Sequence, residues 1–172
     1  MKEYFAMLAR YNLWATRKLY EHVDALPEAD YRGDCGLFFR SVHGTLNHLV
    51  VAGDRVWYPR FAEGTSPQGV RLSDEVAADR GTLKQLLLHG AERWCALVDR
   101  FAAERYAGLL EYTTLRGTRA ALPFAAALAH VFNHGTHHRG QITAALTARG
   151  HAGPELDLVY MLQQEQAAGA AR

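Results

Sequence analysis

Histidines are concentrated in one stretch of this 172-residue chain, residues 130–141, which read HVFNHGTHHRGQ and hold four of the nine histidines. Three of them, His130, His134 and His138, are spaced at i, i+4 and i+8. On a helix this spacing places side chains along one slowly turning stripe. Imidazoles one turn apart can bind a single metal ion through one ring nitrogen each. The stretch therefore predicts a helix that carries a candidate metal site.

A helical wheel at about 100° per residue separates these histidines from one another. His138 falls inside the apolar arc of the helix and His134 at its margin, whereas His130 and His137 lie toward solvent. His134 and His138 are thus the pair expected to face the interior. The alternatives are a histidine-rich surface helix and core histidines that are satisfied by hydrogen bonds. A metal ion needs at least a third ligand, which this helix alone does not supply convincingly.

A second helix, expected over residues 38–61 or 41–61, offers two further histidines. His43 and His48 lie on opposite margins of its apolar arc, so periodicity does not choose between them. Asp54 lies on a different face of this helix from His48 and is not counted as a ligand.

Three segments resemble, in the same order, the helix motifs of the DinB/YfiT-like superfamily. Residues 133–141 (NHGTHHRGQ) resemble the motif of its last helix, and residues 11–19 (YNLWATRKL) resemble that of its first. Residues 46–49 (LNHL), followed by Asp54 and Trp57, resemble the motif of its second helix. The resemblance covers nearly the whole chain, and the motifs of the second and last helices are specific in combination.

The resemblance implies a set of metal ligands and a class of activity. It selects His48 over His43, which gives His48, His134 and His138 as ligands of a divalent metal ion. Zinc and nickel, which imidazole suits, are expected first, with manganese and iron as alternatives. Some members of the superfamily are metal-dependent transferases that use low-molecular-weight thiols, and members commonly form homodimers. The resemblance therefore implies a small-molecule substrate, a thiol co-substrate and a homodimer.

Three hypotheses about function follow from these residues. A metal held by three neutral imidazoles keeps at least one coordination position open, where it can lower the pKa of water to about 7 or bind a thiolate. Metal-dependent chemistry on a small thiol or electrophile is the first hypothesis. The second is a non-catalytic bundle whose ion is structural or sensory, and the third is an all-α dimer without metal.

Three other residues of the last helix have lesser predicted roles. His130 and His137 are secondary candidates for positions near the ion. Arg139 lies on the far side of the wheel from His134, and it is expected to be structural or to anchor a neighbouring chain.

Length and composition predict one globular domain over residues 1–172. The chain is 49% hydrophobic and 22% charged, with a formal net charge of +1, which argues against a nucleic-acid-binding protein. It contains no apolar run near the ~20 residues that a membrane helix needs, and its start lacks the apolar core of a signal peptide. Cys35 and Cys95 are far apart and suit a reducing compartment, so the cytoplasm is the expected location.

Apolar periodicity predicts an all-α four-helix bundle with a short C-terminal helix. The four long helices are expected at residues 3–25, 38–61 or 41–61, 82–103 and 123–149, and the short one at 155–164. Residues 62–80 form a linker long enough to cross the bundle, which permits the up-down-down-up order that the resemblance implies. Residues 110–122 are either a hairpin or an irregular loop.

Local signals set the expected ends of these helices. Pro27 should stop the first helix and Pro59 should bend or end the second. Thr82 is the expected N-terminal cap of the third, and Gly150 the left-handed residue after the fourth. The alanine- and glutamine-rich tail after the short helix is expected to fray.

Overall fold

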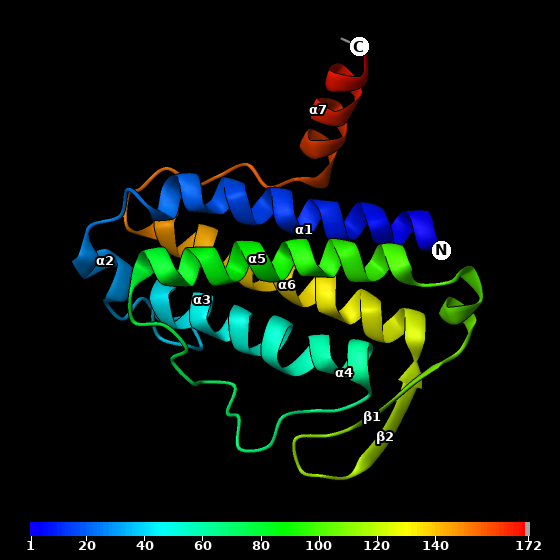
Figure 1. The fold of residues 1–172 in the computed structure, drawn as a ribbon. Helices are drawn as coiled ribbons and strands as arrows, with labels where there is room; N and C mark the ends of the chain where they lie inside the picture. The colour runs from blue at the N-terminus through cyan, green and yellow to red at the C-terminus, as the bar shows by residue number, and fades with distance from the viewer. Residues whose placement is uncertain (171–172) are drawn as a thin grey trace.

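Four long helical segments bury their apolar faces against one another, as the periodicity predicts. The computed structural model describes residues 1–170. In chain order the segments are α1 (Lys2–Val23), a continuous segment made of α3 (Val42–Val50), η1 (Val51–Trp57) and α4 (Tyr58–Glu63), then α5 (Arg80–Arg100) and α6 (Phe124–Ala148). In Figure 1, α1 and α6 run in one direction and the two segments between them run in the other. The predicted four-helix bundle in up-down-down-up order is confirmed.

The crossover between α4 and α5 makes this order feasible. Residues 64–79 contain no helix or strand and run the length of the bundle from the end of α4 to the start of α5 (Figure 1). Two successive helices can run in the same direction only if the chain returns to the end where the first one started. The predicted linker at 62–80 therefore serves as this return.

Most of the core lies in two apolar clusters near opposite ends of the bundle, and a smaller third cluster joins α1 to the C-terminal segment. One includes Phe5, Trp94 and Phe124, and the other includes Leu46 and Ile142, all of them at most 3% exposed. Burying each such side chain stabilises the fold by about 1.5–3 kcal/mol. Along α6 the first cluster ends at residue 132 and the second begins at residue 142. The polar stretch of α6 thus falls between two apolar anchors that hold the helix at both ends.

The second long segment contains a π-helical stretch that the periodicity does not predict. η1 widens the helix over Val51–Trp57, and α4 follows with Pro59 in its first turn. Proline has no N–H to donate, and its ring collides with the carbonyl four residues earlier in a regular α-helix. A widened turn before the proline relieves both problems. The expected bend or end at Pro59 is therefore replaced by a π-helix before it, and the helix continues to Glu63.

At the helix ends, the predicted start of α3 and the left-handed Gly150 are confirmed, whereas the predicted cap of α5 is wrong. Ser41 caps α3 by accepting a hydrogen bond from the backbone N–H of Gly44, so the later of the two predicted starts is correct. Asp79 caps α5 by accepting from the N–H of Thr82. Thr82 is therefore not the cap but the residue that the cap binds, because the helix begins two residues earlier than predicted. Gly150 has φ +79°, the left-handed conformation expected after α6.

The stretch before α6 is a hairpin, which decides between the two alternatives. β1 (Leu109–Thr113) pairs antiparallel with β2 (Arg119–Pro123), with Leu110 opposite Leu122. Two short helices, α2 (Glu28–Arg32) and η2 (Ala103–Ala107), fill the other connections.

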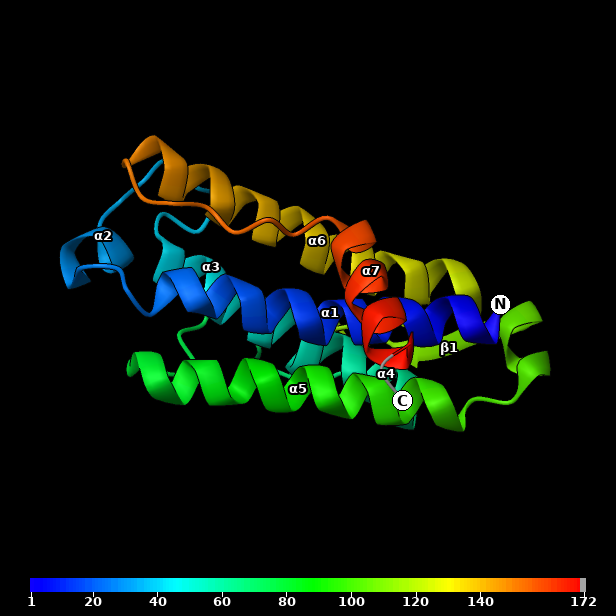
Figure 2. The ribbon, with the colours of Figure 1, turned by 90° about the horizontal axis from the view of Figure 1, so that it is seen from above.

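The C-terminal helix starts later and extends further than predicted. α7 spans Leu158–Ala170 and crosses α1 on the outside of the bundle (Figure 2). Met161 packs against Tyr11, and the indole N–H of Trp14 donates to Gln164 at 2.8 Å. These contacts hold α7 as far as Gln164, and the exposed residues beyond it remain helical to Ala170, where the composition predicted fraying; residues 171–172 lie outside the described residues.

Within residues 1–170, no helix is both long enough and apolar enough to cross a bilayer.

Two glycines of α6 are expected to respond to alanine substitution in opposite directions. A Cβ at Gly135 would lie 3.0 Å from both Asn12 Oδ1 and Arg139 Nη1, whereas a Cβ at Gly140 would meet nothing within 4 Å. Gly140→Ala should stabilise the protein by about 0.5–1 kcal/mol through helix propensity alone. Gly135→Ala should destabilise it by about 1–2 kcal/mol, because the new methyl group displaces the Asn12–Arg139 hydrogen bond. Urea unfolding of both variants measures the difference; equal stabilisation by both substitutions would contradict the packing at Gly135.

Candidate metal centre

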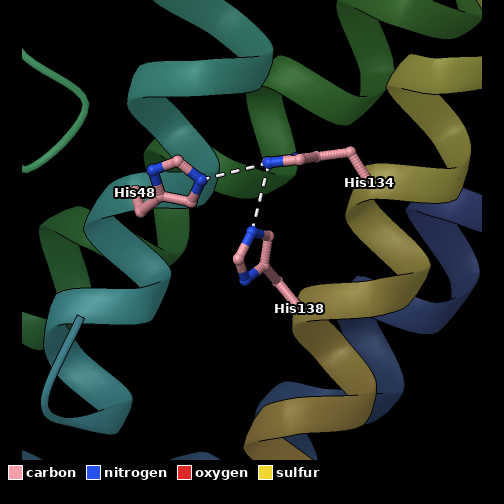
Figure 3. Close-up of side chains that lie close together, drawn as sticks. All are labelled: His48, His134 and His138. Carbon is pink, nitrogen blue, oxygen red and sulfur yellow. Dashed lines mark hydrogen bonds between the residues drawn. The ribbon is translucent and has the colours of Figure 1, made fainter. Parts of the chain in front are cut away.

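The two facing helices α3 and α6 bring three histidines together in the middle of the bundle. His134 and His138 project from successive turns of α6, and His48 reaches toward them from α3 (Figure 3). His134 Nε2 lies 3.1 Å from His48 Nε2 and 3.1 Å from His138 Nε2. The candidate ligand atoms of all three residues lie within 4.8 Å of one another. The structure thus places the three sequence-predicted residues at one point.

Hydrogen bonds at the outer ring nitrogens turn two Nε2 lone pairs toward this point. His48 Nδ1 lies 2.9 Å from the carbonyl oxygen of Leu72, which only accepts, so Nδ1 carries the proton. His138 Nδ1 lies 2.7 Å from Gln141 Oε1 in the same arrangement. In neutral imidazoles, Nε2 is then the acceptor.

The three Nε2 atoms are arranged better for binding a cation than for hydrogen bonding to one another. The single proton that His134 Nε2 can carry cannot satisfy two acceptors equally. A tetrahedral site with metal–nitrogen bonds of 2.0–2.1 Å places its nitrogens about 3.3 Å apart, close to the observed spacing. The donor set and the spacing therefore suit a divalent metal ion.

The charge states of the three rings also suit metal binding. Burial, followed by the neighbouring imidazoles, lowers the pKa of His134 to about 3. Burial lowers the pKa of His138 to about 4, against the opposing effect of its hydrogen bond to Gln141. Burial likewise lowers the pKa of His48. All three are neutral at pH 7, which is the form of imidazole that binds metals.

The segment before α3 and the crossover enclose the histidines from outside the bundle. The ring of Phe39 stacks on that of His48 with centroids 3.8 Å apart and planes 16° from parallel. Phe39 also lines a surface pocket of about 270 Å³ between the start of α3 and the crossover. The crossover supplies the carbonyl of Leu72. Both walls come from irregular backbone, which explains why helical periodicity does not predict them.

Asn47 fixes the crossover to α3. It is 2% exposed, and its Oδ1 accepts from the backbone N–H groups of Val76 at 2.7 Å and Ala77 at 3.1 Å. Its Nδ2 donates to the carbonyl of Ala77 at 3.2 Å. The residue next to His48 thereby holds the loop that positions His48.

Periodicity does not choose between His43 and His48, but in the structure only His48 lies beside His134 and His138. His43 is 6% exposed and turns away from the other histidines, with Nδ1 3.1 Å from the hydroxyl of Tyr31 and Nε2 3.3 Å from Glu75. His130 and His137 are exposed, as the wheel predicts, with ring centroids 5.7 Å from His134 and 4.9 Å from His138 respectively. Neither belongs to the group of converging nitrogens.

Asp54 and Arg139 make internal contacts. Asp54 pairs with Arg93 of α5 at 3.2 Å, consistent with its exclusion from the ligand set, and burial raises its pKa. Arg139 is 3% exposed and donates to Asn12 Oδ1 at 2.7 Å, so it joins α6 to α1. This agrees with a structural role, and the guanidinium is not presented to a neighbouring chain. The Asn12–Arg139 pair was not expected, although both residues lie in segments that resemble superfamily motifs.

Comparisons with known proteins agree with this architecture. The model of the DinB family matches residues 1–168. The chain belongs to the DinB family. Protein DinB of Bacillus subtilis (strain 168) is 26% identical to it over 97% of this chain and 100% of that protein.

A solved structure with the same fold is also known. It is that of YfiT from Bacillus subtilis, described as a probable metal-dependent hydrolase with an unusual four-helix bundle topology. It superposes with a TM-score of 0.67 at 18% identity, over 87% of this chain and 90% of that one. At this level of identity the likeness shows that the DinB-family chain shares the fold.

The contacts of Asn47 predict a specific cost for removing its side chain. Asn47→Ala leaves the backbone N–H groups of half-buried Val76 and buried Ala77 without acceptors, so the free energy of unfolding should fall by about 2–4 kcal/mol. Asn133→Ala, at an exposed position of α6, is the matched control and should change it by less than about 0.5 kcal/mol. Chemical denaturation measures both values, and hydrogen exchange of Val76 and Ala77 should accelerate in Asn47→Ala alone.

Proposed function

We propose that this DinB-family protein is a metal-dependent enzyme that uses a low-molecular-weight thiol to modify a small electrophile. The observation that carries the proposal is the convergence of three neutral imidazole nitrogens from two helices. His48, His134 and His138 would hold the divalent ion, with zinc or nickel favoured by the imidazole donors and manganese or iron as alternatives. An ion bound there would act as a Lewis acid that lowers the pKa of a thiol or water molecule.

The protein's own groups would hold this site in a binding-competent state. Leu72 and Gln141 fix the proton on the outer nitrogen of their histidines, which keeps Nε2 free. Phe39 covers one face of His48 and limits water on the side of the loop. The only role assigned to the three histidines is ligation, because their depressed pKa values make them poor proton donors near neutral pH.

A second candidate is a non-catalytic protein whose ion is structural or sensory. It is favoured by the burial of His48 and His138, which are 4% and 6% exposed, since structural ions occupy closed sites. Hydrolysis through activated water is a third, supported by the description of the YfiT structure alone.

The remaining proposals rest on the superfamily resemblance, on the family match and on the cysteine usage and net charge of the chain. We propose a single domain, because the family model spans residues 1–168. We further propose a cytoplasmic homodimer that acts on a small molecule and binds no nucleic acid.

Removal of each proposed ligand tests the metal site. Protein purified without a histidine tag should contain about one divalent ion per chain, measured by elemental analysis. Replacing His48, His134 or His138 with alanine should weaken cobalt or zinc affinity by at least about 100-fold, because two imidazoles hold a divalent ion poorly. His22→Ala, which removes a histidine from α1, should have no effect. Full occupancy in His138→Ala, or no binding in the wild type, would overturn the proposed ligand set.

Thiol binding separates the enzyme from the alternatives. Cysteine or another small thiol added to the cobalt-loaded protein should produce a new sulfur-to-cobalt absorption band, because a thiolate enters the open position. A structural ion predicts a different pattern, in which a chelator lowers the melting temperature and thiols leave the spectrum unchanged. A hydrolase predicts turnover of model esters without any thiol.

A further inference from the structure

A small cavity lined by both polar and apolar side chains lies between the four long helical segments, behind the candidate metal centre. Its volume is about 50 Å³, and Asn12, Asp54, Gly90, His134 and Arg139 are among its lining residues. A water molecule needs about 10–15 Å³ of such volume and two or more polar partners. The cavity therefore has room for water, and the polar side chains among its lining residues can bind it.

His134 differs from the other two histidines in its outer nitrogen. His48 and His138 each have an acceptor for Nδ1 from within the protein, whereas the described residues supply none to Nδ1 of His134. Among residues 1–170, the buried side-chain atoms that lack both a partner and access to water are Tyr20 Oη, Tyr106 Oη and Arg139 Nε. His134 Nδ1 is not one of them, so water can reach it. A histidine that binds a metal usually donates its other N–H to a carboxylate, a carbonyl or water.

Asp54 is the carboxylate that the cavity offers. None of the other lining residues is acidic. The widened turns of η1 carry Asp54 toward α5, where Gly90 makes room for it: a Cβ on Gly90 would lie 3.1 Å from Asp54 Cγ. Arg93 contacts the carboxylate through a single nitrogen, at 3.2 and 3.3 Å, so further lone pairs remain to accept hydrogen bonds from water.

We propose that Asp54 is a positioning residue for His134, which it reaches through water molecules held in this cavity. The water would accept a hydrogen bond from His134 Nδ1 and donate one to the Asp54 carboxylate. His134 would then have an acceptor for its outer nitrogen, as His48 has in Leu72 and His138 has in Gln141. A hydrogen-bonded partner of this kind fixes the tautomer and orientation of a ligating imidazole and raises its basicity. This inference rests on the proposed metal site.

Metal affinity in matched variants tests the role of Asp54. Asp54→Asn keeps the size of the side chain and removes its charge, and it should weaken zinc or cobalt binding by about 10–100-fold, measured by competition with a chromophoric chelator. Arg93→Met removes the ion-pair partner and leaves the carboxylate in place, so affinity should change by less than about threefold. Gly90→Ala displaces the carboxylate by a few tenths of an ångström and should give an intermediate loss.

A second measurement on the metal-free protein separates positioning from a general loss of structure. In ¹⁵N-histidine-labelled protein, Asp54→Asn should shift the ring nitrogens of His134 while leaving those of His43 unchanged. Arg93→Met should move neither, and the free energies of unfolding show whether each variant remains folded.

Each outcome bears on one proposal or the other. Equal losses of affinity in Asp54→Asn and Arg93→Met would assign Asp54 to helix packing and overturn the inference. Unchanged affinity and unchanged His134 signals in Asp54→Asn would also overturn it, with the metal site intact. If the wild-type protein binds no metal, the proposed function is wrong. The His134 signals of the metal-free protein then show whether Asp54 and His134 are linked through the cavity.

Discussion

The central constraint on this fold is that three imidazole nitrogens, each able to present a lone pair, face one another across about 3 Å. Without an ion this arrangement satisfies the hydrogen-bonding needs of the rings poorly. It persists because neighbouring groups hold the rings from outside: Leu72 and Gln141 by hydrogen bonds, and Phe39 by stacking. The apolar clusters at the two ends of the bundle in turn fix α3 and α6, so the polar centre depends on the packing around it.

Much of this architecture could be predicted because helices obey a simple period. The apolar arc of α6 placed His138 inside, His134 at the margin and His130 and His137 outside, and their exposures follow that order. The bundle and the left-handed Gly150 followed from equally local rules, whereas the crossover order was implied by the resemblance and only permitted by the length of the linker. Periodicity could not choose between His43 and His48, since both lie at the edges of one arc; only the resemblance to known motifs chose, and the structure places His48 beside α6 and His43 beside α2.

The features that escaped prediction depend on partners distant in sequence. Asp54 and Gly90 come from different helices, and a glycine in α5 has no evident purpose until the carboxylate beside it is seen. The carbonyl of Leu72 lies in an irregular loop whose path no periodicity describes. The continuation of α7 to Ala170 follows instead from local propensity, because its exposed last turns are rich in alanine and glutamine, which favour helix.

The order of the helices also bears on how the chain folds. α1 packs mainly on α5 and α6, not on the helix that follows it in sequence. Its principal contacts thus join residues separated by roughly half of the chain or more, whereas a simple up-and-down bundle pairs each helix with the next. Loop closure must come before those contacts can form, which raises the relative contact order. This bundle should therefore fold more slowly than helical proteins of equal length and stability whose neighbours in space are also neighbours in sequence.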